Sequence, residues 1–204
     1  MIRGFDWSNN QGNLDAEQAA FNGFAFCFHK ASQGTTFADP YYHGNIQGIL
    51  NSGMQPGAFH YATPQRCQPI DEAQWFIDVT HDEASGMIPI LDIEDDEELG
   101  PVPNNAPLWA AAWLSKVELH YGVKPLIYLN PNLMRRLSWT PVAAAGYGLW
   151  LAAWGGQLPL QVKPWSFAAF WQQRPDGKAY PTGPDCCVDF FNGSVARLPL
   201  YGLA

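Results

Sequence analysis

Short apolar runs alternate with segments of helical periodicity along the first two thirds of the chain. Runs of about four to eight residues rich in β-branched and aromatic side chains are typical of strands, whereas apolar residues that recur every third or fourth position are typical of helices. We predict strands at Ile2–Trp7, Phe24–Ala31, Gln55–Ala62, Ile88–Glu94, Pro125–Leu129, Leu149–Trp154, Phe167–Gln172 and Cys187–Phe191. We predict helices at Asp15–Asn22, Tyr41–Asn51, Ile70–His81, Ala106–Tyr121 and Asn132–Leu137.

Strands that alternate with helices are typical of an α/β protein with a parallel sheet. The helices become sparse after residue 138, where Pro, Gly and Trp dominate the connections. No internal repeat, low-complexity tract or linker divides the 204 residues. We therefore predict one domain over residues 1–204, a modified TIM-like (β/α) barrel of eight strands and about five helices.

The clearest helix is the one predicted at Ala106–Tyr121. Asn105 stands at its N-cap position and Pro107 in its first turn, where both residue types are favoured. Four residues at helical spacing share one face of it: Leu108, Ala112, Ser115 and Leu119.

Two acids follow the apolar run Met87–Leu91. Side chains alternate across a strand, so Asp92 and Glu94 share a face, with backbone positions about 6.6 Å apart at ~3.3 Å per residue. Desolvation by this apolar strand and mutual repulsion are expected to raise the pKa of one of the two carboxyls, as a general acid near neutral pH requires. The alternative is a strand that simply ends in solvated acids, because residues 95–98 are all acidic.

Polar and aromatic residues that could take part in catalysis or ligand binding collect where the predicted strands end. They are Asp6, Lys30, His60, Tyr61, Asp92, Glu94, Tyr128, Asn130, Trp154, Trp171 and Gln172, with Asp189 on the last strand. In a β/α barrel the chemistry lies at the carboxyl ends of the strands. Since random placement would scatter these residues along the strands, we predict that they form one active site.

The composition narrows the class of partner. A chain with 47% hydrophobic and 15% charged residues is globular, and its net charge of −8 argues against a nucleic-acid-binding surface. No apolar stretch approaches the ~20 residues that cross a bilayer, and the N-terminus shows no secretory signal pattern. Nine Trp, eight Tyr and twelve Phe exceed ordinary core needs and suit the stacking of sugar rings.

The four cysteines match no metal-binding spacing. They are Cys27, Cys67, Cys186 and Cys187. We expect free thiols, with a bridge from Cys67 to one of the adjacent pair as the alternative.

Eight short motifs occur in order along most of the chain. They are Gly4–Gly12 (GFDWSNNQG), His29–Gly34 (HKASQG), Asp39–Tyr41 (DPY), Gly57–Tyr61 (GAFHY), Leu91–Glu94 (LDIE), Pro125–Tyr128 (PLIY), Leu149–Trp154 (LWLAAW) and Phe170–Gln172 (FWQ). Their order and spacing resemble glycoside hydrolase family 25, the Chalaropsis-type lysozymes or N-acetylmuramidases. The resemblance implies a single catalytic barrel that acts on bacterial peptidoglycan without a cofactor or metal.

The resemblance also assigns roles to the acids. Glu94 matches the proton donor to the glycosidic oxygen, and Asp92 and Asp6 match the supporting acids. Asp189 matches the last acidic position of the family, although the segment after it is two residues shorter than the family pattern. Asp185 is therefore the fallback for this position.

The remaining predicted site residues would bind the substrate. Tyr61, Tyr128, Trp154 and Trp171 are expected to line the sugar cleft with Gln172, and core packing is the alternative for each aromatic residue. Lys30 is expected to pair with an acid at the rim, with a plain strand-end position as the alternative, and His60 to be a barrel histidine that holds a carboxylate.

The implied reaction is hydrolysis of the β-1,4 bond between N-acetylmuramic acid and N-acetylglucosamine. Carboxyls about 5–5.5 Å apart would favour direct nucleophilic attack, and about 6.5–9.5 Å would leave room for water. In a third route, which the resemblance favours, the 2-acetamido oxygen of the substrate attacks while Asp92 orients it.

Two other functions fit parts of the sequence. The acids at Asp92–Glu98 are also suited to a metal-dependent hydrolase or lyase, and a non-catalytic wall-binding barrel would keep the aromatic residues. We expect a monomer whose partner is cell-wall peptidoglycan, with no nucleic acid and no membrane insertion. The absence of a leader pattern fits a phage-type enzyme released from the cytoplasm, or a module of a longer secreted protein.

Overall fold

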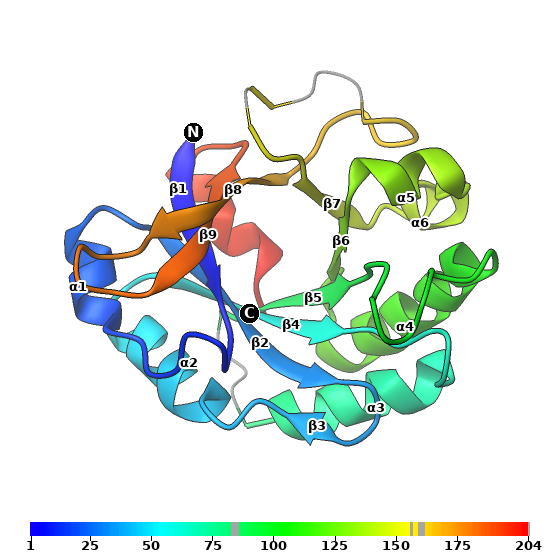
Figure 1. Ribbon diagram of the computed structural model, residues 1–204, viewed down its shortest axis with the longest axis horizontal. Helices are drawn as coiled ribbons and strands as arrows, with labels where there is room; N and C mark the ends of the chain where they lie inside the picture. Colours follow the sequence, from blue (N-terminus) through cyan, green and yellow to red (C-terminus); the bar gives the residue numbers. More distant parts are fainter. Residues whose placement is uncertain (83–85, 156, 159–161, 204) are drawn as a thin grey trace.

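The computed structural model describes residues 1–82, 86–155, 157–158 and 162–203. Its strands are β1 (Ile2–Trp7), β2 (Phe26–Gln33), β3 (Phe37–Ala38), β4 (Gln55–Tyr61), β5 (Ile88–Asp92), β6 (Leu126–Leu129), β7 (Gly148–Ala152), β8 (Phe170–Lys178) and β9 (Asp185–Phe191), as drawn in Figure 1. Its helices are α1 (Ala16–Phe21), α2 (Tyr42–Asn51), α3 (Pro69–Thr80), α4 (Ala106–Tyr121), α5 (Pro131–Arg136), α6 (Thr140–Ala144) and the 3₁₀ helix η1 (Val195–Tyr201).

Every strand and helix predicted from the sequence is present in the structure, although most begin or end at a different residue. The sequence pattern missed β3, α6 and η1. These elements are two, five and seven residues long, and segments this short carry too few apolar positions to show a period.

The strands close into a barrel of eight. Each strand is hydrogen-bonded to the next in the order β1-β9-β8-β7-β6-β5-β4-β2, and β1 also pairs with β2, which closes the ring; β3 lies outside it against β2. In Figure 1, α2, α3 and α4 run along the outside of the wall that contains β2, β4 and β5. The predicted barrel is therefore confirmed.

One strand departs from the parallel arrangement that the alternation predicts. All neighbouring pairs from β1–β2 to β7–β8 are parallel, but β9 runs antiparallel to both β8 and β1. The cause is the connection: β8 and β9 form a hairpin without the helix that a parallel crossover needs.

Alternation along the strands separates two hydrophobic cores. Phe26, Phe28 and Trp150 point into the barrel, where they belong to the inner cluster. Cys27 and Leu149, their chain neighbours, belong to the outer cluster between the barrel and the helices. The inner cluster fills the barrel below its carboxyl end, so that a ligand cannot pass through the barrel.

Two glycines make room for this inner core. A Cβ atom at Gly4 would lie 2.3 Å from the ring of Phe26, and one at Gly57 would lie 2.4 Å from the ring of Phe28. Such contacts are too short, so small residues must face large ones across the barrel.

The apolar face predicted for α4 is its solvent side. Leu108 and Leu119 are 66% and 85% exposed, whereas Trp113, Leu114 and Val117 on the other side are buried. Pro107 lies in the first turn as predicted, but the side chain of the N-cap residue makes no capping hydrogen bond. Trp113, together with Leu114 and Val117, therefore anchors this helix.

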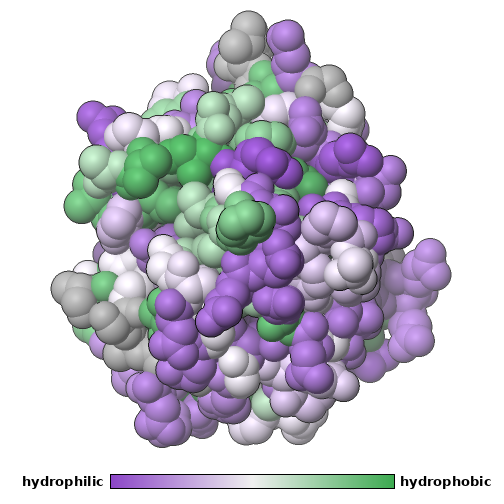
Figure 2. All heavy atoms as spheres, turned by 90° about the vertical axis from the view of Figure 1, so that its left-hand side faces the viewer, coloured by the Kyte–Doolittle hydropathy of each residue, from purple (hydrophilic) through white to green (hydrophobic). Residues whose placement is uncertain are grey.

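The surface carries both hydrophobic and hydrophilic residues. Figure 2 shows the side of the molecule that lies on the left in Figure 1, where hydrophobic residues gather in the upper part and hydrophilic residues cover most of the lower part. Exposed large apolar side chains include Phe21 on α1 and Val195 on η1. No helix in the described part of the chain is long and apolar enough to span a membrane.

Candidate active site

A pocket of about 250 Å³ opens at the end of the barrel where the parallel strands finish. It is lined by Asp6, Ser8, Asn10, Lys30, Phe59, Tyr61, Asp92, Glu94, Tyr128, Trp150, Trp154, Gln172 and Cys187. We call it the acid pocket. It brings together the predicted site residues of seven strands and their following loops, apart from Asp189, His60, Trp171 and Asn130.

Asp92 and Glu94 are in hydrogen-bonding contact through their carboxyl groups. Asp92 ends β5 and is only 5% exposed, and no N–H or hydroxyl donor among the described residues reaches its Oδ1. Burial, and then the negative charge of Glu94, raises the pKa of Asp92 well above its ordinary value. Burial also raises the pKa of Glu94, although the hydrogen bond from Asp92 opposes this.

This pair therefore retains one proton that both carboxyls share. The sequence argument gave that proton to Glu94 and the charge to Asp92. The structure instead buries Asp92 more deeply than Glu94, and the hydrogen bond between the two raises the pKa of Asp92 and lowers that of Glu94, so that Asp92 donates this hydrogen bond in the free protein.

Asp6 on β1 and Asp189 on β9 form a second acid pair. The antiparallel register sets Asp189 level with Gly4, so it lies below Asp6 and is fully buried. Asp189 accepts a hydrogen bond of 2.8 Å from Trp150 Nε1 through Oδ1, and no N–H or hydroxyl donor of the described chain reaches Oδ2.

The two carboxyls of this second pair are also hydrogen-bonded to each other. Burial raises the pKa of Asp6 from 3.8 to about 6, against hydrogen bonds from Gln172, Cys187 and Asp189 that lower it. Burial and the charge of Asp6 raise the pKa of Asp189 well above its ordinary value. The proton therefore belongs to the deeper acid, which donates to Asp6.

Gln172 on β8 joins the two sides of the pocket. Its Nε2 donates to Asp6 Oδ2 at 2.6 Å, and its Oε1 accepts from Tyr128 and from Trp154 Nε1, each at 2.9 Å. An amide with one acceptor and two donors around it has only one orientation that satisfies all three. Gln172 therefore holds Asp6 and the rim aromatics in a fixed relation.

Lys30 lies in the acid pocket but does not form the predicted ion pair among the described residues. Its Nζ donates to Gln33 Oε1 at 2.7 Å and lies 4.9 Å from the centre of the Tyr61 ring. Burial lowers the pKa of Lys30, and its charge lowers the pKa values of Asp92 and Glu94. The lysine thus acts on the acids through its field rather than by contact.

Two predicted residues, His60 and Trp171, point away from the barrel interior. His60 is fully buried behind β4, where it stacks on Trp113 of α4 and bonds Glu72 of α3 at 2.8 Å. Trp171 is buried on the outer side of β8, and its Nε1 donates to Ala153 at 2.7 Å.

The reason is strand alternation. Consecutive strand residues point to opposite sides of a sheet, so Tyr61 and His60 cannot both face the barrel, nor can Gln172 and Trp171. His60 does hold a carboxylate, as expected, but this carboxylate lies in the helical layer and not at the rim.

Five lining residues were missed: Ser8, Asn10, Phe59, Trp150 and Cys187. Trp150 stands two and four positions before Ala152 and Trp154, so the period of two that puts the second tryptophan at the mouth also points the first into the barrel. Phe59 precedes Tyr61 by the same step. Cys187 gave no such signal, because the antiparallel direction of β9 is not visible in the sequence.

The structure favours Asp189 over Asp185 as the last rim acid. Asp185 begins β9 at the far end of the hairpin, where it is exposed and pairs with Lys178 at 3.1 Å. The four cysteines are free thiols, as expected.

The acids after Glu94 do not converge on one point. Asp95 pairs with Arg136 at 2.7 Å, and Asp96 accepts hydrogen bonds from Tyr61 at 2.9 Å and from two backbone amides. Within the described residues, no three His, Cys, Asp or Glu side chains are arranged to hold a metal ion. The geometry therefore gives the metal-dependent alternative no support.

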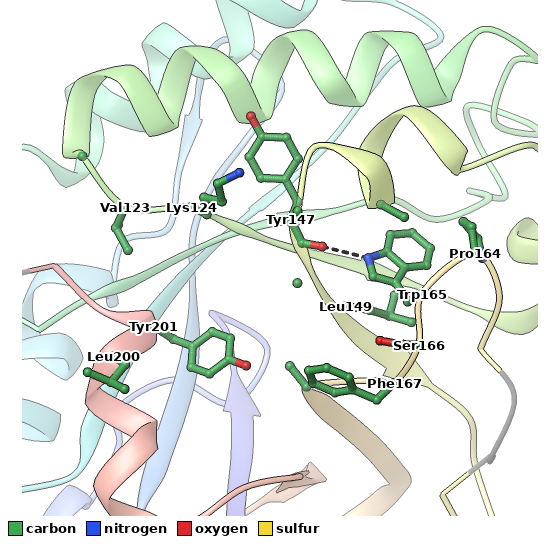
Figure 3. A pocket seen from close by; sticks show the side chains of 15 residues that line it. Val123, Lys124, Tyr147, Leu149, Pro164, Trp165, Ser166, Phe167, Leu200 and Tyr201 are labelled. Carbon is green, nitrogen blue, oxygen red and sulfur yellow. Dashed lines mark hydrogen bonds between the residues drawn. The ribbon is translucent and has the colours of Figure 1, made fainter.

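A larger pocket of about 640 Å³ lies at the opposite end of the barrel, beside the amino ends of β6 and β7. Figure 3 shows Tyr201 of η1 and Phe167 around it, with Trp165 donating to the Tyr147 carbonyl at 2.7 Å. Among the described residues, no carboxylate lines it. Since the chemistry predicted from the sequence depends on carboxyl groups, the smaller acid pocket is the candidate active site.

Comparisons with known proteins agree with the motifs. Residues 5–179 match the family model of glycosyl hydrolases family 25. Lysozyme M1 of Streptomyces globisporus is 25% identical over 207 residues, which cover 97% of this chain and 70% of that protein. An uncharacterized Escherichia coli O157:H7 protein, YegX, is 30% identical over 95% of this chain and 67% of its own.

Solved structures show the same fold. The muramidase from Acremonium alcalophilum superposes with a TM-score of 0.81 at 25% identity, over 98% of each chain. The bacterial lysozyme from Streptomyces coelicolor superposes with a TM-score of 0.87 at 24% identity, over 98% of this chain and 96% of its own.

Proposed function

This chain belongs to glycosyl hydrolases family 25, and we propose that it is a lysozyme-type peptidoglycan hydrolase acting through the acid pocket. The bond that it would cleave is the β-1,4 link from N-acetylmuramic acid to N-acetylglucosamine. Relatives named lysozyme and N,O-diacetylmuramidase support this substrate. The pocket supports the chemistry, because buried carboxyls with raised pKa values can still donate a proton near neutral pH.

The contact between Asp92 and Glu94 is the observation that supports a particular route. Two carboxyls that flank a sugar as acid and nucleophile stand about 5–5.5 Å apart, and an attacking water needs about 6.5–9.5 Å. A hydrogen-bonded pair is closer than either arrangement. We therefore favour attack by the 2-acetamido oxygen of the substrate on its own anomeric carbon.

The shared proton suits this route. When it moves fully to Glu94, that residue can protonate the leaving glycosidic oxygen, and ionised Asp92 can accept the acetamide N–H and aim its oxygen. The anomeric carbon is then attacked from one side as its bond to the leaving oxygen breaks. Water later opens the cyclic intermediate, and Glu94 takes up the proton that this water releases.

Asp6 would stabilise the positive charge that develops on the sugar ring. Its pKa of about 6 leaves it mostly ionised at neutral pH, and Asp189 below it supplies a hydrogen bond to the carboxylate. Fixed charges in a site of low dielectric are effective because they need no reorganisation during the reaction.

The rim aromatics would bind the sugars. Tyr61, Tyr128 and Trp154 border the acid pocket, and Trp154 is 63% exposed although its Nε1 is fixed by Gln172. An exposed ring held in place offers an apolar face to a sugar at little entropic cost. We further propose that residues 1–204 act as one monomeric catalytic domain at the cell wall.

The test is to digest purified peptidoglycan, reduce the products with borohydride and identify the reduced sugar. A muramidase exposes N-acetylmuramic acid at the new reducing end, so muramitol should accumulate with time. Accumulation of glucosaminitol would contradict the bond assigned here. Release of peptides without any new reducing end would contradict glycoside hydrolysis altogether.

A further inference from the structure

A second pocket continues the acid pocket on one side. It has a volume of about 490 Å³ and shares Glu94, Tyr128 and Trp154 with the acid pocket. Because three residues border both, the two form one continuous cleft. A ligand whose reacting bond lies at Glu94 therefore extends into this second pocket, which we call the side pocket.

The side pocket carries a cation, Arg135. Arg135 lies in the last turn of α5 and is exposed; the described residues give it no ion pair and no hydrogen bond. Its neighbour Arg136 differs, because it donates to Asp95 at 2.7 Å and to the Val102 carbonyl at 3.2 Å. One arginine of the helix is thus used by the fold, and the other is available to a ligand.

The position of Arg135 is well anchored despite the shortness of the helix. Asn130 Oδ1 accepts from the Leu133 amide at 3.0 Å at the start of α5, and Trp139 Nε1 donates to the Leu133 carbonyl at 3.0 Å. Leu133 itself is fully buried. The guanidinium is therefore presented from a fixed backbone, which lowers the entropic cost of binding.

The charges of the cleft are distributed unevenly. The acid pocket holds four carboxyls in or directly below its wall, and its only lysine already donates to Gln33. An anionic group is repelled there. Next to Glu94, the side pocket offers an unpaired guanidinium, whose fork of N–H donors matches a carboxylate.

We propose that Arg135 binds a carboxylate on the side arm of the muramic acid residue next to the cleaved bond. This inference rests on the proposed function, which places that sugar beside Glu94. Its side arm has two sources of carboxylate: the lactyl group itself, when it is free, and the acidic residue of a peptide stem joined to it. Either would turn the side pocket into a specificity site for muramic acid over plain N-acetylglucosamine polymers.

The test compares wild type with Arg135→Gln on three soluble glycans. The first carries peptide stems, the second has been stripped by an amidase so that lactyl carboxylates are free, and the third is the stripped glycan with those carboxylates amidated. Arg174→Gln is the matched control, because Arg174 is an exposed arginine of the β8–β9 hairpin that pairs with Asp176 and lines neither pocket.

We expect Arg135→Gln to raise KM about five- to tenfold on a carboxylate-bearing glycan, with kcat within about twofold, as an exposed charge contact would. On the amidated glycan the variant should match wild type, and Arg174→Gln should match it on all three. A defect on the stripped glycan identifies the lactyl carboxylate, and a defect on the stem-bearing glycan alone identifies the stem.

An equal loss on all three glycans would overturn the proposal, since it would mean that Arg135 supports the fold rather than an anion. No loss on any of them, with wild type active, would also overturn it while leaving the proposed function intact. If wild type released no reducing ends from any glycan, the proposed function itself would fail, and this inference with it.

Discussion

Buried carboxylic acids lie on both sides of the barrel wall, and the two groups differ in the hydrogen-bond donors that surround them. Glu72 lies behind β4 in the helical layer and is fully buried. Its carboxylate accepts hydrogen bonds from His60 Nε2 at 2.8 Å and from the amide of Thr63 at 3.1 Å, and the Thr63 hydroxyl also donates to it. His60 in turn is bonded to Ser32 at 2.8 Å, so the whole group is satisfied.

Inside the barrel the acids face one another instead. Asp92 contacts Glu94, and Asp189 contacts Asp6, and in each pair one buried oxygen receives no N–H or hydroxyl donor from the described residues. In the described part of the chain no arginine or histidine lines the pocket that holds them, and Lys30 acts only at a distance. The difference separates structure from function: a donor-rich surrounding stabilises a buried acid, whereas an acid-rich surrounding keeps a proton available at a cost in stability.

The largest expected effect is the loss of hydrolysis in Glu94→Gln. Removing a general acid costs about 10²–10⁴ in rate, so the release of reducing ends from purified walls should fall at least about a hundredfold. The amide keeps the size of the side chain, and the melting temperature should stay at or above that of wild type. A rate within a few fold of wild type would show that Glu94 is not the proton donor.

The reverse result is expected for Glu72→Ala. Removing one partner of a buried pair leaves His60 and Thr63 without their acceptor, and the free energy of unfolding should fall by about 3 kcal/mol or more. Urea unfolding measures this loss. Glu72→Gln, which keeps one acceptor oxygen, should lose less, and both variants should hydrolyse walls normally per folded molecule at low temperature. A large loss of activity in folded Glu72→Gln would contradict the purely structural role assigned to Glu72.

A smaller, pH-dependent gain in stability is expected for Asp6→Asn. The pKa of Asp6 is raised from 3.8 to about 6, so the folded protein binds this proton more tightly than the unfolded chain does. Its contribution is favourable at low pH and is lost as the pH rises through about 6. At pH 8 the variant should therefore exceed wild type by on the order of 1 kcal/mol in urea unfolding, and below pH 4 the difference should vanish.

Asp176→Asn is the control for this pH effect. The ion pair with Arg174 lowers the pKa of exposed Asp176, so replacing it should give no gain in stability at pH 8. Equal or lower stability of Asp6→Asn at pH 8 would mean that the carboxylate of Asp6 is stabilised in the fold rather than kept at a cost.

The smallest effects distinguish the two tryptophans that the sequence placed together in the cleft. Trp154→Ala should raise KM about two- to tenfold, because an exposed aromatic platform is worth roughly one kcal/mol to a stacked ring, with the fold intact. Trp171→Phe should leave KM unchanged and lower the free energy of unfolding by about 1 kcal/mol, through the lost hydrogen bond to Ala153. A KM effect at Trp171 would place it in the cleft after all.

Much of the barrel was predictable from local pattern. Each strand inside the barrel is a short apolar run bounded by turn residues, and the long helix α4 has its proline and its C-terminal glycine in the expected places. These features are local because they depend on backbone preferences and on the few residues around them. The short elements β3 and α6 were not predictable, since packing and not periodicity holds them.

The site was predictable only in part. The sequence located Asp6, Asp92 and Glu94 because acids at the ends of parallel strands must meet at one end of a barrel. It did not decide which member of His60–Tyr61 or of Trp171–Gln172 faces inward. That choice depends on the register with the neighbouring strands, which pairs Tyr61 with Asp92 and Gln172 with Asp189.

By itself, then, the amino-acid sequence determined the type of fold, the family and the acids at the carboxyl end of the barrel. These follow from periodicity and from the order of short motifs. Only the tertiary structure decided that β9 runs antiparallel, that Asp189 lies beneath Asp6, and that each of these acids is hydrogen-bonded to a second acid. The physical reason is that a pKa depends on burial and on neighbours brought from distant parts of the chain, and neither exists until the barrel closes.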